Sequence, residues 1–264
     1  MHPIERLRWL ARAHGESAAT LATEVAWTLA DLAVDEPHAL VTACRRLLDS
    51  HVAVAQLWWV SATVLVAADP AEAARQVVEE LCDDPTALVL AAALGVAVPG
   101  GGIIAVTTPA DTVRDAVARR PDVAVRVLGS LPQLHGEVRS FGTVSDQATG
   151  WELDEACRAV DGASLAIVEV IAAGPDGMLV SPDALPLIES ARAASVPCWA
   201  VAGVGTMLNS QLMRELGRRA ADRVRLVAPG SFELMVGPEG GAAPNEATAR
   251  VACPQAPELL ARAG

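Results

Sequence analysis

Apolar residues in the first hundred positions recur at intervals of three and four, which is the spacing of one face of a helix. Short breaks that contain proline, acidic residues or serine separate the apolar stretches, and such residues favour helix starts. The pattern therefore predicts an all-helical N-terminal domain, residues 1–98, with helices over residues 4–13, 18–33, 39–48, 52–67, 70–82 and 86–94.

The pattern changes at the Val-Pro-Gly-Gly-Gly segment of residues 98–102, after which short β-branched runs alternate with helical stretches. The glycines of this segment lack the G-x-G-x-x-G order of a phosphate loop and precede a strand, so an interdomain hinge is the better interpretation. Alternating helices and apolar strands are typical of a parallel sheet covered on both faces. We therefore expect residues 99–264 to form an α/β domain.

Within this domain the pattern places each element. Strands are predicted over residues 103–107, 123–128, 165–171, 198–204 and 224–227, with 138–144 as a further candidate. Helices are predicted over residues 109–120, 151–160, 183–194 and 207–221, and the Gly/Pro/Ala-rich residues 237–245 predict a loop.

Composition excludes several classes of function. The chain has 264 residues, of which 52% are apolar, so it can bury a large core and is not intrinsically disordered. Its formal charge of -12 opposes binding to nucleic-acid phosphates. All 20 basic residues are arginine, which excludes a Schiff-base lysine and a P-loop lysine.

Cysteines and histidines show no metal-ligand spacing, so we expect no metal and no cofactor. The cysteines are widely spaced and odd in number, which predicts free thiols, with Cys157 and Cys198 in the core. The most apolar stretch, residues 52–68, is too short and too closely flanked by charge to span a membrane. The charged N-terminus lacks an apolar signal segment, and we expect a cytoplasmic protein.

Ligands of open α/β sheets bind at the carboxyl ends of the strands, which selects the candidate site residues. At the end of the first strand and just after it come Thr107, Thr108, Asp111 and Thr112, whose hydroxyls and helix N-terminal amides could hold a phosphate. The same residues also read as an ordinary helix cap. Ser130 follows the second predicted strand in the same way.

Glu169 lies inside an apolar strand, where a carboxylate is costly unless it is paired. Burial would raise its pKa toward the range of an acid/base catalyst, and a structural carboxylate paired with an arginine is the alternative. Asp176 and Gly177 belong to a strong turn signal that could border a ligand, and Ser181 precedes a predicted helix whose amides could face an anion. These residues complete the candidate site.

Six segments, in order, resemble one protein family: residues 49–58 (DSHVAVAQLW), 104–113 (IAVTTPADTV), 127–132 (VLGSLP) followed by Gly136, 168–181 (VEVIAAGPDGMLVS), 196–200 (VPCWA) and 252–260 (ACPQAPELL). The family comprises the alpha, beta and delta regulatory subunits of translation initiation factor 2B, methylthioribose-1-phosphate isomerase and ribose-1,5-bisphosphate isomerase. The resemblance covers residues from about 39 to the end. It implies a helical N-terminal domain followed by a Rossmann-like parallel-sheet domain (NagB/RpiA/CoA-transferase-like), and a homodimer.

The sequence departs from the isomerases at their functional positions. Thr108 or a neighbour stands where the family's catalytic cysteine is expected, and Ile171 stands at the position of the catalytic aspartate. Leu131 replaces the arginine of the family's S-R-P motif, and Ser181-Pro182 replaces an asparagine-lysine pair. The resemblance thus implies a divergent member that binds a phosphorylated metabolite, a sugar phosphate or a nucleotide, without the family's isomerase chemistry. The alternative is an aldose–ketose isomerase rebuilt around Glu169.

Overall fold

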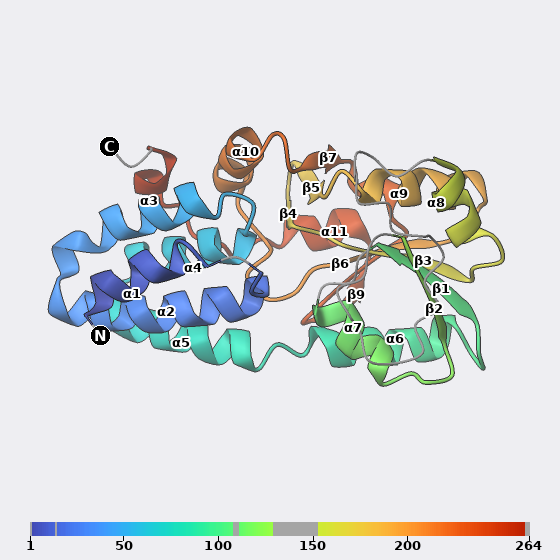
Figure 1. The fold of residues 1–264 in the computed structure, drawn as a ribbon, viewed down its shortest axis with the longest axis horizontal. Helices are drawn as coiled ribbons and strands as arrows, with labels where there is room; N and C mark the ends of the chain where they lie inside the picture. Colours follow the sequence, from blue (N-terminus) through green and yellow to red (C-terminus); the bar gives the residue numbers. More distant parts are fainter. Residues whose placement is uncertain (1, 14, 108–110, 129–152, 262–264) are drawn as a thin grey trace.

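The computed structural model describes residues 2–13, 15–107, 111–128 and 153–261. Figure 1 shows two parts side by side along the long axis, a group of helices that includes the N-terminal segment and a β-sheet with helices packed against it. The chain crosses from the helices to the sheet and returns, since the last helical turn, η3 (Pro257–Leu260), lies against helices α3 and α10.

The helical part consists of α1 (Pro3–Leu10), α2 (Ala18–Asp35), η1 (Pro37–Ala39), α3 (Leu40–Ser50), α4 (Ala55–Val66) and α5 (Pro70–Cys82). Local signals set the helix starts, because the Ser17 hydroxyl accepts a hydrogen bond from the Thr20 N–H at 3.1 Å and Asp69 Oδ1 accepts one from the Glu72 N–H at 3.0 Å. The structure confirms the expected N-terminal helical region.

The larger sheet contains β1 (Ile103–Thr107), β2 (Ala124–Leu128), β3 (Leu165–Glu169), β6 (Cys198–Val201), β8 (Leu234–Gly237) and β9 (Gly240–Ala242). The strand order is β2-β1-β3-β6-β8-β9, and every neighbouring pair is parallel except β8 and β9. This arrangement confirms the α/β class that the sequence pattern predicted.

Helices cover both faces of this sheet (Figure 1). On one face, α6 (Thr86–Ala97) and α7 (Asp111–Ala118) cover Ile104, Val106 and other alternate strand residues. On the opposite face, α8 (Leu153–Val160) and α9 (Ala184–Ala193) cover smaller side chains such as Ala105 and Ala166. Both faces are thus buried over most of the sheet, which explains why most strand residues are apolar.

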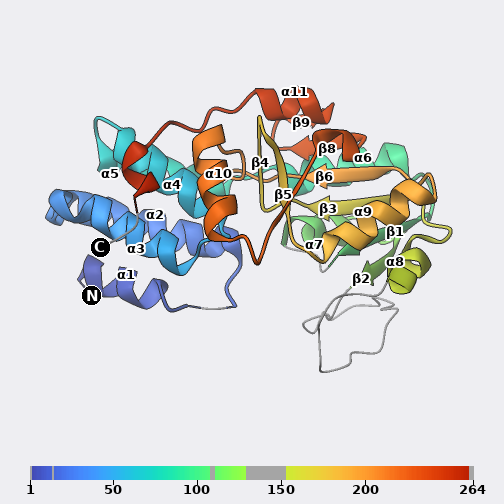
Figure 2. The same ribbon diagram turned by 90° about the horizontal axis from the view of Figure 1, so that it is seen from above.

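A second, antiparallel sheet joins the two parts of the molecule. It contains β4 (Ala172–Gly174), β5 (Gly177–Val180) and β7 (Arg225–Val227), in the order β4-β5-β7. Figure 2 shows β4 and β5 between the larger sheet and the helical part. Helix α10 (Ser210–Arg219) contacts β4, and its apolar side chains belong to the same buried cluster as helices α1 to α5.

Four sequence expectations about strands were wrong, one of them the strand over 198–204, which ends at Val201. Residues 225–227 form an edge strand of the antiparallel sheet instead of joining the parallel one. The expected strand 165–171 ends at Glu169, after which the chain enters β4. The expected loop 237–245 contains β9 and the start of α11 (Pro244–Ala249). Gly-Gly-Ala in β9 carries no strand propensity, and the strand exists because it pairs with β8. The candidate strand 138–144 lies outside the described residues.

Helix α6 packs with the sheet although it precedes the glycine-rich segment. Its buried Leu90 and Leu94 belong to a cluster with Ile104 and other strand residues. In the N-terminal segment, Leu81 is the last buried residue that belongs to the helical cluster. The domain boundary between residues 98 and 99 stays a prediction. Among the described residues, Leu81 still packs in the helical cluster, whereas Leu90 packs in the cluster of the sheet.

All five cysteines are free. Cys44, Cys198 and Cys253 are buried, whereas Cys82 and Cys157 are exposed. The expected core position of Cys157 was therefore wrong, because the residue lies on an outer face of α8. Among the described residues, no helix is both long and apolar enough to cross a membrane.

Candidate functional site at the carboxyl edge of the sheet

The strand order reverses at β1, and this creates the position where open α/β sheets bind ligands. From β1 the chain passes to β2 on one side, and the next strand of the sheet, β3, lies on the other side. Val106 is opposite Ile167 in the ladder between β1 and β3. Thr107 and Glu169, which end these two strands, therefore lie at the same edge of the sheet.

Glu169 has the most perturbed carboxyl group at this edge. Burial, with smaller contributions from the nearby carboxylates of Asp111 and Asp84, raises its pKa from 4.5 to about 7. Hydrogen bonds from the Thr112 hydroxyl and the Val113 N–H oppose the shift, because they stabilise the charged form. The Oε2 atom is buried and has no hydrogen-bond partner among the described residues. A buried polar atom of this kind is costly unless a ligand or a solvent molecule satisfies it.

Asp84 reaches the same place from the connection between α5 and α6. Its Oδ1 accepts hydrogen bonds from the N–H and the hydroxyl of Thr86, at 2.8 and 2.5 Å. Its Oδ2 accepts one from the Val204 N–H at 2.9 Å, in the loop that follows β6. Asp84 therefore caps α6 with one oxygen and fixes the loop after β6 with the other.

The loop after β6 passes so close to other elements that two of its residues must be glycine. A Cβ atom on Gly203 would lie 2.8 Å from the Asp84 Oδ2 atom. Gly205 has a φ of +77° and a Cβ there would lie 2.7 Å from a ring carbon of Trp59, in α4. The helical part and the sheet edge thus meet at this loop.

The structure brings four of the residues selected from the sequence to this edge: Thr107, Asp111, Thr112 and Glu169. Asp111 forms an ion pair with Arg114 one turn along α7. Among the described residues, no ion pair joins Glu169 to an arginine, which was the structural alternative for this carboxyl group. Thr108 and Ser130 lie outside the described residues.

Asp176, Gly177 and Ser181 lie on the hairpin of β4 and β5 and on the connection that follows it. Asp176 forms an ion pair with Arg214 at 3.4 Å and lines a cavity of about 480 Å³ between α10 and β7. Gly177 has a φ of +134°, and a Cβ there would lie 2.8 Å from the Val227 carbonyl oxygen, so the turn alone requires glycine. The Ser181 carbonyl accepts a hydrogen bond from the Ala184 N–H at the start of α9.

Asp84 was missed by sequence reasoning. The sequence Asp-Pro-Thr at residues 84–86 was read only as a helix start, which is one of its two roles. The second role depends on Val204, 120 residues further along the chain, and no local pattern announces that contact. Within the described residues, no group of three or more His, Cys, Asp and Glu side chains could hold a metal ion.

Comparison with solved structures identifies proteins that share this fold. No family model matches the sequence, and no match is found among curated protein sequences. Among solved structures, the translation initiation factor eIF-2B of Pyrococcus horikoshii OT3 is similar with a TM-score of 0.69 and 13% identity, over 93% of this chain and 98% of that one. The chain has the fold of the initiation factor 2B subunits.

Two further structures share this initiation factor 2B fold. A chain of the tetrameric eIF2B-beta2-delta2 complex from C. thermophilum aligns with a TM-score of 0.67 and 15% identity, over 92% of this chain and 91% of that one. The 5-methylthioribose 1-phosphate isomerase of Pyrococcus horikoshii OT3 aligns with a TM-score of 0.58 and 13% identity, over 92% and 85%. The fold expected from the six sequence segments is thereby confirmed.

Proposed function

We propose that the protein binds a small phosphorylated metabolite, a sugar phosphate or a nucleotide, at the carboxyl edge of the larger sheet. The observation that carries this proposal is the buried Oε2 atom of Glu169, which has no hydrogen-bond partner in the part of the chain that the structure describes and lies where the strand order reverses. One solved relative in fold is named for its action on 5-methylthioribose 1-phosphate, which supports the choice of ligand class.

The ligand hydroxyls would be held by the carboxyl group of Glu169. With a pKa of about 7, this group is partly protonated near neutral pH and can both donate and accept a hydrogen bond. A sugar hydroxyl also does both, so the pair is chemically matched. In this proposal Asp84 shapes this end of the site, since its two oxygens hold the start of α6 and the loop after β6 in place.

The phosphate would be held at the start of α7. The remaining N–H groups of the α7 N-terminus are donors for an anion, while the Thr112 hydroxyl, which donates to Glu169, links this end of the site to that carboxyl group. The negative charge of Asp111 is offset there by its ion pair with Arg114. In this proposal Thr107, Thr108, Asp111 and Thr112 serve the phosphate end, and Glu169 serves the hydroxyl end.

The proposed activity is binding without the isomerase chemistry. Moving a proton between adjacent carbons requires a positioned acid and a positioned base. Among the buried side-chain atoms of the described residues, Glu169 Oε2 is the unpartnered carboxyl oxygen, while both oxygens of Asp84 accept structural hydrogen bonds. Residue 131 is leucine, whereas the isomerase motif has an arginine there that is expected to anchor the phosphate.

Thermal unfolding with added ligands tests this proposal. We expect ribose 5-phosphate, methylthioribose 1-phosphate, ribose 1,5-bisphosphate or AMP to raise the melting temperature, because a ligand that binds only the folded state stabilises it. The shift should disappear in Glu169→Ala and persist in Glu239→Ala, a change at an exposed glutamate on the turn between β8 and β9. A wild-type protein that none of these compounds stabilises would contradict the proposal.

The second candidate function is isomerisation with Glu169 as the acid/base group, and the raised pKa of this residue favours it. Incubation with each aldose phosphate and detection of the ketose separates the two functions. We expect no appreciable turnover. Robust turnover that is lost in Glu169→Gln would show that Glu169 is catalytic.

We further propose that the chain forms a homodimer. Leu226 on the edge strand β7 is 62% exposed, and one solved structure of the same fold is a tetrameric complex. An edge strand with an exposed apolar side chain is suited to pairing with another chain. Light scattering at micromolar concentration should report twice the 27.3 kDa mass of the chain, and a strict monomer would contradict the expectation.

A further inference from the structure

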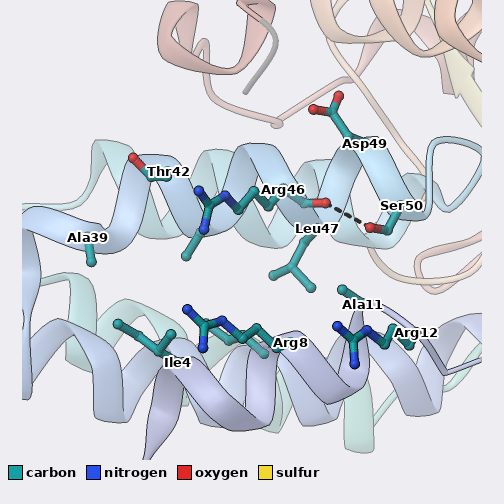
Figure 3. A pocket seen from close by; sticks show the side chains of 12 residues that line it. Ile4, Arg8, Ala11, Arg12, Ala39, Thr42, Arg46, Leu47, Asp49 and Ser50 are labelled. Atoms are coloured by element: carbon teal, nitrogen blue, oxygen red, sulfur yellow. Dashed lines mark hydrogen bonds between the residues drawn. The ribbon is translucent and has the colours of Figure 1, made fainter. Parts of the chain in front are cut away.

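A groove between α1 and α3 forms a cavity of about 430 Å³ in the helical part, away from the sheet edge. Figure 3 shows the two helices running along its sides. Its apolar lining comes from both helices and from η1, through the side chains of Ile4, Leu7, Ala11, Ala39, Ala43 and Leu47. A cavity of this size falls within the range of small-molecule sites.

Three arginines surround this apolar lining. Arg8 comes from α1, Arg12 from the turn that follows it, and Arg46 from α3 on the other side (Figure 3). Arg8 has only a long contact, 3.5 Å, with the exposed Glu5, and neither Arg12 nor Arg46 has an ion-pair partner among the described residues. The one acidic residue on the lining, Asp49, forms an ion pair with Arg219 and points away from the arginines in Figure 3.

This concentration of positive charge is unusual for the chain. The protein carries a formal charge of -12, and many of its arginines are engaged with carboxylates on the same helix, as Arg75 is with Glu72 and Arg218 with Glu215. In the groove, three arginines instead line one apolar surface, Arg8 and Arg12 on one side and Arg46 on the other (Figure 3). Guanidinium groups bind carboxylates and phosphates in a forked geometry.

We propose that this groove binds a small anionic amphiphile, a molecule with an apolar body and one carboxylate or phosphate head. The apolar body would lie along Leu7, Ala43 and Leu47, and the head would lie between the guanidinium groups. Nothing in this proposal depends on the ligand proposed for the sheet edge, because the lining residues come from other elements.

Size and charge favour a small ligand over a macromolecule. Twelve residues line the groove, whereas a stable protein–protein interface involves about 20–30 residues on each side. A polyanion or a strongly acidic protein would also be repelled by the charge of -12, whereas a ligand with one anionic group experiences mainly the local arginines.

Titration calorimetry on the full chain tests the proposal with decanoate and decyl phosphate as probes. We expect saturable binding of at least one of them with a stoichiometry of one per chain. Decanol and decyltrimethylammonium, which have the same apolar body without the negative charge, should bind at least about tenfold more weakly, since each charge-assisted hydrogen bond is lost. A comparison of the two probes shows which head group the site prefers.

Variants locate the binding. The double change Arg12→Gln/Arg46→Gln should weaken binding by about tenfold or more, and Arg119→Gln/Arg223→Gln, which removes the same charge from exposed positions elsewhere, should not. Ala43→Leu should reduce binding further by filling the groove, and circular dichroism shows whether that variant is folded. The arginine side chains are exposed, so the first test does not depend on the fate of Ala43→Leu.

Three results would overturn the proposal. They are no saturable binding of either anionic probe up to millimolar concentration, equal binding by wild type and the groove double variant, or equal binding of decanol. Micromolar binding of an acidic amphipathic peptide together with no binding of either probe would also overturn it, and would instead identify the groove as a peptide site.

Discussion

Replacing Arg219 with alanine should lower the free energy of unfolding by about 3–5 kcal/mol, the loss typical of breaking a buried ion pair. The Arg219 side chain is 2% exposed and contacts three elements at once. Its guanidinium donates to Glu215 at 2.6 Å, to Asp49 at 3.0 Å and to the Leu259 carbonyl at 2.9 Å. It also lies over the Trp58 ring, with its central carbon 5.1 Å from the centroid.

The size of this effect follows from what the substitution leaves behind. Without Arg219, the largely buried carboxylate of Glu215 loses one of its two cationic partners. The backbone carbonyl of Leu259 and the face of the Trp58 ring lose theirs as well. Arg219→Lys should recover only part of the stability. A planar guanidinium has five donors that reach several acceptors at once and a flat face that stacks on Trp58, and a compact ammonium group has neither.

Urea unfolding measures the change, and Arg218→Ala is the matched control. Arg218 pairs with the same Glu215 carboxylate, but its side chain is 58% exposed. Exposed ion pairs add little to stability because water screens them, so Arg218→Ala should have a much smaller effect than Arg219→Ala. Equal losses in the two variants would contradict the idea that burial, and not the ion pair itself, gives Arg219 its importance.

Glu169→Gln should remove a pH dependence of stability worth about 3 kcal/mol between pH 4.5 and 7. The pKa of Glu169 is raised from 4.5 to about 7 by burial, so the folded protein holds this proton more tightly than the unfolded chain does. The contribution of the protonated Glu169 to the free energy of unfolding is at its full value below pH 4.5. It is lost as the pH rises toward 7, and it does not change further above that pH.

The comparison is the difference in unfolding free energy between wild type and variant at each pH. Glutamine does not titrate, so this difference isolates residue 169 from the other carboxyl groups. We expect wild type to lose stability relative to Glu169→Gln as the pH rises from 4.5 to 7. Glu239→Gln, at an exposed position, should show no such trend. A wild type that gains stability relative to the variant over this range would show that Glu169 is charged and paired in the folded protein.

Local chemistry explains which parts of the fold could be predicted. Ser17 and Asp69 cap their helices with side-chain hydrogen bonds, and these signals are readable within four residues of sequence. The β-branched runs of β1 and β3 are equally visible, since both faces of these strands are buried. Strand β9 could not be predicted, because Gly-Gly-Ala becomes a strand only through its pairing with β8.

The candidate site divides in the same way. Glu169 was recognisable as a carboxyl group within an apolar run, and its position at a strand end marks an edge of the sheet. Asp84 was not recognisable in this role, since its contact with Val204 depends on how the connection before α6 meets the loop after β6. The grouping of Arg8, Arg12 and Arg46 likewise depends on the packing of α1 against α3, which the spacing of the arginines does not reveal.

The helical cluster is completed by residues from the far end of the chain. Cys253, Ala256 and Leu259 are buried in the cluster formed by α1 to α5. The last of these helices, α5, ends at Cys82. On a ribosome, these residues follow α5 by about 170 positions, so roughly 10 to 30 s of synthesis separate the two at ordinary elongation rates. During that interval the apolar side chains that await the C-terminal segment are open to chaperones, and the helical part reaches its final packing only after residue 259 has been released.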